Sequence, residues 1–331
     1  LYLGTENALY FSLDKGDNWQ SLMTNLPSSP MYWMDIPEHF NDLVVGTYGR
    51  GIWILDDLTP IQQFSSEVAS SSLHLFEPKD AYRLHPVSMV MQFFKEASFG
   101  DNPPEGTSIH YWQSEEMEDG VSLEISNAAG EAIRTIEHKG KVGINRVWWD
   151  FKEDPTTTLK LRTKPLHSDW FPMKDDRTRE SLVPPMSLMS TPGVYTVTLK
   201  AGDLEQTQSF ELIKDPNSEG SLEDIQKQKD LLDRIRADFE EISLAVNEAE
   251  KLRRQLRDLM PMVPEDLLEN VKALDELATS VENQMLQLKH SGKGQDMIRL
   301  PGMLMEKFNY LAKKHPALEE LQKRLGLDPD Y

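Results

Sequence analysis

A repeat near the start of the sequence limits the possible folds more than any other feature. Residues 1–14 align without a gap on residues 43–56, which gives an offset of 42 residues. The identical pairs are Leu1 and Leu43, Gly4 and Gly46, Thr5 and Thr47, Leu13 and Leu55, and Asp14 and Asp56. One blade of a β-propeller typically occupies about 40–50 residues. Because only about one and a half copies are present, residues 1–60 predict a partial β-propeller.

The strand pattern within residues 1–60 predicts two separate antiparallel sheets of about three strands each. The first sheet is expected from residues 1–5, 8–12 and 19–22, and the second from residues 31–36, 43–47 and 52–55. Each sheet lacks one strand of a four-stranded blade, so strand edges and blade faces that normally pack are left open. We therefore expect Trp19, Trp33 and Trp53 to be less buried than in a complete propeller.

The segment from Ser12 to Trp19 matches the Asp-box pattern S-x-D-x-G-x-x-W. Asp14 is suited to accept backbone N–H groups within the turn, and Gly16 supplies a positive φ. Trp19 is suited to pack the turn against the blade. The pattern predicts a structural role for Ser12, Asp14, Gly16 and Trp19; the alternative for Asp14 is a catalytic acid or a metal ligand.

Two further regions follow, with a boundary between them near residue 215. Residues 61–84 are rich in serine and are interpreted as a linker with a short strand at residues 73–76. Residues 85–215 are predicted to form an Ig-like β-sandwich. The alternation of Val121, Leu123 and Ile125 indicates a strand with one buried face. Residues 154–191 form a proline-containing excursion between two strands, too long for an ordinary loop, which indicates function or disorder.

Residues 216–331 have a helical period and are predicted to form an antiparallel bundle of three helices. Ser221 and Asp224 have the spacing of a capping box. Apolar residues then recur every seven positions, at Ile225, Leu232, Phe239 and Val246. The third helix is expected from Met303 to Leu325. Such a seam forms either an intramolecular core or a coiled coil with a partner.

Composition excludes several classes of function. The formal net charge of −20 disfavours nucleic acid, because a phosphate surface would be repelled. No cysteine is present, and no apolar stretch approaches the ~18 residues of a membrane-spanning helix. The histidines lack metal-ligand spacing, and neither Glu115–Glu116 nor Asp175–Asp176 suggests the carboxyl geometry of a glycosidase. We therefore predict no cofactor and no metal.

The motifs resemble a known family. The Asp-box turn and residues 41–57 are similar to the end of a bacterial BNR/Asp-box, sortilin-like β-propeller protein, a type often labelled glycosyl hydrolase. In that family an Ig-like domain and a helical tail follow, and residues 102–106, 143–150 and 192–197 match its second domain. The resemblance implies a periplasmic or extracellular protein whose partners are the remaining propeller blades and a protein or glycan.

The resemblance also places Tyr48 and Arg50 on the rim of the functional face of the propeller. A guanidinium group there is able to bind a carboxylate with two parallel hydrogen bonds. The alternative is a turn arginine that caps carbonyl groups or pairs with an acid of the neighbouring blade.

These observations lead to one functional hypothesis and one alternative. The hypothesis is that the chain is the C-terminal part of an exported β-propeller protein, is itself non-catalytic, and braces the propeller or binds a protein or glycan partner. The alternative is that it is a fragment of a sialidase-like glycoside hydrolase whose active site lies mostly in missing N-terminal blades.

Overall fold

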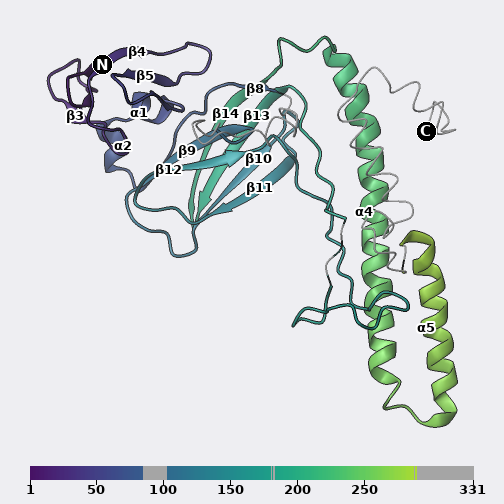
Figure 1. Cartoon of the computed structure of the whole chain (residues 1–331). Helices are drawn as coiled ribbons and strands as arrows, with labels where there is room; N and C mark the ends of the chain where they lie inside the picture. The colour runs from purple at the N-terminus through teal and green to yellow at the C-terminus, as the bar shows by residue number, and fades with distance from the viewer. Residues whose placement is uncertain (85–102, 180, 182, 287, 289–331) are drawn as a thin grey trace. The chain divides into compact units, whose positions relative to one another are not determined.

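The computed structural model describes residues 1–84, 103–179, 181, 183–286 and 288 (Figure 1). The chain divides into two compact units. The first comprises Leu1–Lys152 and Pro192–Ser218, and the second comprises Glu153–Thr191 together with the chain from Glu219 onward. Within the described residues, the fold is multidomain and rich in β-structure, with helices concentrated in the second unit.

Two three-stranded antiparallel sheets form the start of the first unit. One sheet has the order β1-β2-β3 and the other has the order β4-β5-β6. Their strands are β1 (Tyr2–Gly4), β2 (Leu9–Phe11), β3 (Gln20–Ser21), β4 (Met31–Asp35), β5 (Leu43–Thr47) and β6 (Ile52–Leu55). The expectation of two separate sheets, each of about three strands, is confirmed.

The two sheets pack face to face around a small hydrophobic core. Its buried members are Leu9, Met31, Leu43, Val45 and Leu58. Gly4 lies directly under β4, because a Cβ atom added to this glycine would stand 2.8 Å from the Cβ of Met31. The close approach of the two sheets therefore requires glycine at position 4.

The two hairpins of the repeat differ in loop length by one residue. The first is closed by a hydrogen bond from Thr5 N to Ala8 O, and the second by one from Thr47 N to Gly51 O. As a result Gly4 pairs with Leu9, whereas Gly46 pairs with Ile52. The gapless alignment therefore holds for β1 and β5, but it is wrong by one residue for β2 and β6.

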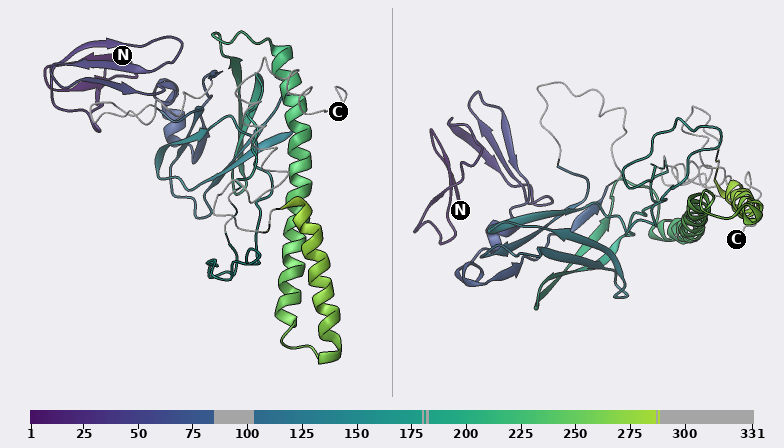
Figure 2. Two further views of the ribbon diagram at one scale, coloured as in Figure 1. Left: turned by 45° about the vertical axis from the view of Figure 1, so that its right-hand side comes forward. Right: turned by 90° about the horizontal axis from the view of Figure 1, so that it is seen from below.

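The rest of the first unit contains two further β-sheets, and we call this pair of sheets the sandwich (Figure 2). The five-stranded sheet has the order β11-β10-β13-β14-β8, and the three-stranded sheet has the order β12-β9-β7. The strands are β7 (Leu73–Leu75), β8 (Ala81–Arg83), β9 (Thr107–Gln113), β10 (Val121–Ser126), β11 (Ala132–His138), β12 (Gly143–Trp149), β13 (Gly193–Ala201) and β14 (Leu204–Lys214).

Aromatic residues join the two sheets of the sandwich. The ring of Trp149 on β12 lies 5.3 Å from the ring of Tyr195 on β13 and 6.0 Å from the ring of Phe210 on β14, measured between centroids. Trp149 is fully buried. These contacts take the place that a disulfide occupies in other sandwiches, and they agree with the absence of cysteine.

Residues 61–84, interpreted above as a linker, contribute to the sandwich. This segment contains most of α1 (Thr59–Gln63), all of α2 (Ser66–Ser70), and strands β7 and β8. β7 pairs antiparallel with β9, and β8 pairs parallel with β14. Residues 85–102, where the sandwich was expected to begin, lie outside the described residues.

The second unit contains a helical hairpin and the excursion. α4 (Leu222–Leu259) begins with the predicted capping box, in which Ser221 and Asp224 bond each other's backbone N–H groups, and α5 (Glu265–Met285) follows after a short turn. The excursion supplies Leu159, Leu161, Met186 and Leu188 to two hydrophobic clusters with α4. The third helix predicted at 303–325 lies outside the described residues.

None of the described helices combines the length and the apolar character needed to cross a membrane.

Candidate functional site

The turn from Ser12 to Trp19 is held by hydrogen bonds among its own residues. The Asp14 carboxylate accepts from Ser12 Oγ at 2.8 Å and from Asn18 N at 2.8 Å, and Ser12 Oγ accepts from Gly16 N at 2.8 Å. Gly16 has φ +106°, a conformation that favours glycine. The bond from the Asn18 backbone, with those from the Asn18 and Ser12 side chains, lowers the pKa of Asp14 to about 2. The assignment as an Asp-box remains a prediction.

Tyr48 and Arg50 lie in the turn between β5 and β6. The Tyr48 side chain is exposed, and its ring meets the ring of Tyr32 edge to face at 5.5 Å. The carbonyl of Arg50 accepts a hydrogen bond from Trp53 Nε1 at 3.0 Å. Among the described residues, the Arg50 guanidinium makes no hydrogen bond or ion pair, so neither the carbonyl cap nor the acidic partner proposed for it is present there.

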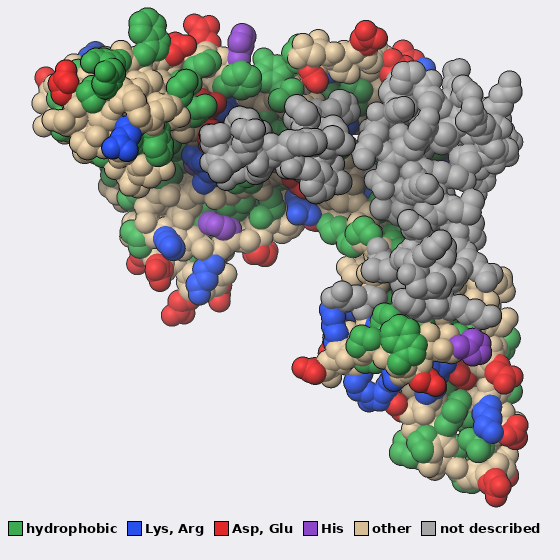
Figure 3. Space-filling view, in the orientation of Figure 1, with side chains coloured by type: hydrophobic (Ala, Val, Ile, Leu, Met, Phe, Trp, Pro, Cys, Tyr) green, Lys and Arg blue, Asp and Glu red, His purple; other side chains and the backbone are tan. Residues whose placement is uncertain are grey.

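Below this turn, the outer surface of β4-β5-β6 is apolar and open. Trp33 is 73% exposed, Ile52 is 74% exposed and Ile54 is 58% exposed. Figure 3 shows hydrophobic side chains at the surface of this region. An open tryptophan was expected here, but the two isoleucines were not identified. The signal was available in residues 52–55, an unbroken apolar run that makes both faces of the strand apolar.

A buried polar contact joins the N-terminal sheets to the sandwich. Asp57 follows β6 and is 3% exposed. Its carboxylate accepts hydrogen bonds from Ser108 Oγ on β9 at 2.7 Å and from Thr59 N at 3.1 Å, and it lies 3.5 Å from His110 Nδ1. Burial opposes ionisation of Asp57, but the bonds from Thr59 and Ser108 and the nearby His110 hold its pKa below the usual value.

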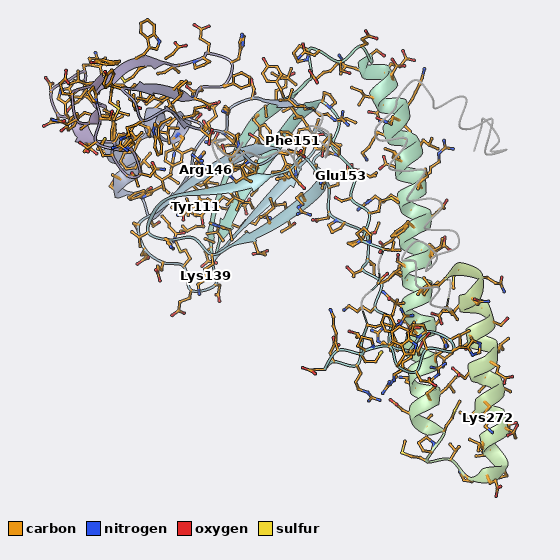
Figure 4. All side chains as sticks on the ribbon, in the orientation of Figure 1. Tyr111, Lys139, Arg146, Phe151, Glu153 and Lys272 are labelled. Carbon is orange, nitrogen blue, oxygen red and sulfur yellow. The ribbon has the colours of Figure 1, made fainter. Side chains whose placement is uncertain are left out.

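Arg146 on β12 completes this contact (Figure 4). Its Nε donates to His110 Nε2 at 2.9 Å, and its Nη2 donates to the carbonyl of Asp56 at 2.8 Å. Because Nε2 accepts a hydrogen bond, His110 is neutral and carries its proton on Nδ1, which faces Asp57. Burial lowers the pKa of His110 to about 4. We call the four side chains of Asp57, Ser108, His110 and Arg146 the joint.

The joint contains a serine, a histidine and an aspartate, but its geometry does not fit nucleophilic catalysis. Ser108 donates to Asp57 and not to His110. Arg146 occupies the Nε2 position of His110, where a nucleophile would have to bond. The arrangement is therefore suited to holding two parts of the chain together. The sequence analysis missed it, because residues 57 and 108 lie 51 positions apart.

A second buried cluster holds the excursion against the helices. Glu250 on α4 accepts hydrogen bonds from Thr163 N at 2.6 Å and from Thr163 Oγ1 at 2.7 Å. Arg253 donates to Glu282 on α5 at 2.5 Å and to Glu250 at 3.4 Å. Burial, and then the charge of Glu250, raise the pKa of Glu282 to about 8. We call Glu250, Arg253 and Glu282 the helical cluster.

The paired carboxylates and the possible metal ligands form no site among the described residues. Glu115, Glu116, Asp175 and Asp176 are exposed, as expected for solvated carboxylates. Within the described ranges, no group of three or more histidine, aspartate or glutamate side chains has the arrangement of a metal site.

Comparisons with known proteins add little. No family model matches the chain, and no curated protein matches it. Among the solved structures with similarity to it is PorZ, described as an essential bacterial surface component of the type-IX secretion system of Porphyromonas gingivalis. The identity is 14%, the match covers 63% of this chain and 20% of PorZ, and the TM-score is 0.20. The chain thus spans about a fifth of the length of PorZ, and a TM-score of this size supports no functional argument.

Proposed function

We propose that this chain has a non-catalytic, structural role: its sandwich braces the end of a β-propeller. The observation that supports this most directly is the joint. Asp57 belongs to the segment that closes the repeat, and its buried carboxylate bonds Ser108 of the sandwich at 2.7 Å. Arg146 adds a second bond from the sandwich to the same segment, in which its Nη2 donates to the carbonyl of Asp56.

A buried polar contact of this kind is suited to a brace because separating its two sides costs free energy at once. Pulling the two parts apart would leave a carboxylate and a hydroxyl without partners before water could reach them, at a cost of about 1–3 kcal/mol for the hydroxyl and more for the charged carboxylate. The contact is also directional, so it fixes one orientation, which an apolar contact of equal area would not do. The proposed brace is therefore stiff as well as stable.

The wider setting belongs to the same proposal. The repeat, the two three-stranded sheets and the resemblance to BNR/Asp-box, sortilin-like proteins support the C-terminal part of an exported propeller protein, periplasmic or extracellular. Its partners would be the remaining blades and a protein or glycan, with Tyr48 and Arg50 as candidates for contact. The glycoside hydrolase alternative remains a hypothesis without an observation that favours it.

Hydrogen exchange resolved by segment tests the brace. In the wild type, amides of β5, β6 and β9 should share one opening free energy, because the joint couples the sheets to the sandwich. Asp57→Asn, which keeps the shape but removes the charge, should speed exchange in β5 and β6 while β10 and β13 stay protected. Glu124→Gln, in a half-exposed ion pair with Lys200, is the matched control. Independent opening of β5–β6 and β9 in the wild type would contradict the proposal.

A further inference from the structure

Helix α5 has three sides of different chemistry. One side packs on α4, where Asp275 and Glu282 lie within ion-pair distance of Arg253 (Figure 1). A second side is charged and exposed, and it carries Glu265, Glu269, Lys272 and Glu276. The third side is apolar, and it carries Leu267, Leu274, Leu277 and Val281. We call these four apolar residues the α5 stripe.

The α5 stripe lies at the surface. Its four side chains are between 47% and 62% exposed. Their spacings of seven, three and four residues place them along one line of the helix. Asn270, Ala273 and Gln284 lie beside this line, and the charge next to it is Asp266 in the first turn. An exposed apolar stripe with so little charge around it is typical of the centre of a protein–protein interface.

The apolar seam of α4 differs, because it is used within the chain. Leu232 and Phe239 are buried in a cluster with Met186 and Leu188 of the excursion. Val246 is buried in a second cluster that includes Leu159 and Leu161 of the excursion. For the seam of α4, the alternative of an intramolecular core is therefore the correct one. The α5 stripe is a separate apolar surface, on a helix whose polar side already faces α4.

The apolar positions of α5 are symmetric about Leu274. Val271 and Leu277 lie three residues from it on either side, and Leu267 and Val281 lie seven residues from it. Val271 is half-buried and borders the α5 stripe. An interface about a two-fold axis needs a surface that is complementary to itself, because residue i contacts residue j and residue j contacts residue i. Two antiparallel copies of α5 centred on Leu274 satisfy this condition.

The charges of α5 favour the antiparallel arrangement over the parallel one. The first turn carries Glu265 and Asp266, and the last turn carries no basic residue. Parallel copies would place the two acidic first turns side by side, where like charges repel. Antiparallel copies place each acidic turn beside the uncharged Asn283 and Gln284 of the other copy.

We infer that the α5 stripe binds the same stripe of a second copy of this chain, with the two helices antiparallel and a two-fold axis beside Leu274. Leu267 of one copy then contacts Val281 of the other, and Val271 contacts Leu277. This dimer goes beyond the proposed brace, because α5 belongs to the second unit and the joint belongs to the first.

Sedimentation velocity of the full chain tests the dimer. Leu274→Lys places two ammonium groups against each other at the axis, so this variant should sediment as a monomer. Leu244→Lys is the matched control, since Leu244 on α4 is 50% exposed and Leu274 is 53% exposed. The wild type and the control should sediment as dimers. A wild type that stays monomeric up to its solubility limit overturns the inference, and so does a Leu274→Lys chain that still dimerises.

Disulfide cross-linking tests the antiparallel register independently of that variant. The chain has no cysteine, so introduced thiols report contacts without background. A disulfide requires Cα atoms within about 7 Å of each other. A mixture of Leu267→Cys and Val281→Cys chains should cross-link on mild oxidation. Each of these chains alone should not, because the same position in the two copies lies ~21 Å apart along the helices.

Lys272→Cys, on the charged side of α5, is the control for chance collisions. Cross-linking of Leu267→Cys with itself, or equal cross-linking at Lys272→Cys, overturns the inference. None of these variants alters the joint, so failure of the dimer is distinguishable from failure of the brace.

Discussion

The joint and the helical cluster both bury charged groups, but they balance them differently. In the joint, one carboxylate faces a neutral histidine, and Arg146 reaches a backbone carbonyl. In the helical cluster, Arg253 lies within ion-pair distance of Glu250, Glu282 and Asp275, and the buried Arg179 interacts with the two glutamates as well. Among the described residues, Arg253 Nε and Nη2 and Glu282 Oε1 lack hydrogen-bond partners.

This difference indicates that the two regions are stabilised in different ways. The joint stabilises one relative orientation of the sheets and the sandwich, because it consists of separate directional hydrogen bonds. The helical cluster depends on a charge balance that a single change can upset, since burying an unpaired charge costs far more than a lost neutral bond. The following predictions are ordered by expected size.

The largest effect is expected from Arg253→Ala. It leaves Glu250 and Glu282 buried together without the cation that bonds both of them, which should cost the second unit about 3–5 kcal/mol. Urea unfolding followed by helical circular dichroism measures the loss. Arg254→Ala, the neighbouring residue in a more exposed pair with Asp258, should change stability by less than about 1 kcal/mol. Equal losses in the two variants would remove the contrast between the helical cluster and ordinary surface pairs.

A smaller loss is expected from Ser108→Ala. The variant removes one donor to Asp57 and should cost about 1–3 kcal/mol in the first unit. Hydrogen exchange in β9 reports this loss, and Ser122→Ala on β10 is the control, because its side chain is only half-buried. If Ser108→Ala lowers stability as much as Arg253→Ala does, the joint depends on the balance of its charges and not on separate hydrogen bonds.

Changes of pH should act on the two regions in opposite directions. His110 has a lowered pKa, so the folded first unit disfavours its protonation and should lose stability as the pH falls from 6.5 toward 4. Glu282 has a raised pKa, so the second unit should lose stability as the pH rises from 4.5 toward 8. Each slope is at most about 1.4 kcal/mol per pH unit for one group.

Exchange in β9 and in α5, corrected for the intrinsic rate at each pH, measures the two slopes separately. His110→Gln should flatten the first slope, and Glu282→Gln should flatten the second. Slopes of the same sign in the two wild-type regions would contradict the comparison.

The smallest effect is expected from Asp14→Ala. Its carboxylate is exposed and bonds only within its own turn, so the change should loosen the amides of Gly16 and Asn18 and leave the sandwich unaffected. Amide exchange at these two positions measures it, with Asp17→Ala as the control in the same turn. Unfolding of the sandwich in Asp14→Ala would show that the turn carries more than its local bonds.

The features that could be predicted are those set by residues close together along the chain. The alternation at Val121, Leu123 and Ile125 predicted β10, and the Ser221–Asp224 spacing predicted the start of α4. A short strand was expected at residues 73–76 and β7 lies there, but its pairing with β9 was not predicted, because three residues carry too little pattern to indicate a partner. Neither the joint nor the helical cluster was predictable, since Asp57 and Ser108 lie 51 positions apart and Arg253 and Glu282 lie 29 positions apart.

The excursion has a consequence for synthesis on the ribosome. Leu159, Leu161 and Met186 are made before the α4 residues that bury them, Phe239 and Val246. At roughly 5–20 residues per second, several seconds separate the two groups. During that interval the strands on either side of the excursion, β12 and β13, are free to assemble, while the excursion itself remains a loose apolar loop. A chaperone that binds nascent chains would therefore have several seconds in which to bind the apolar residues of the excursion.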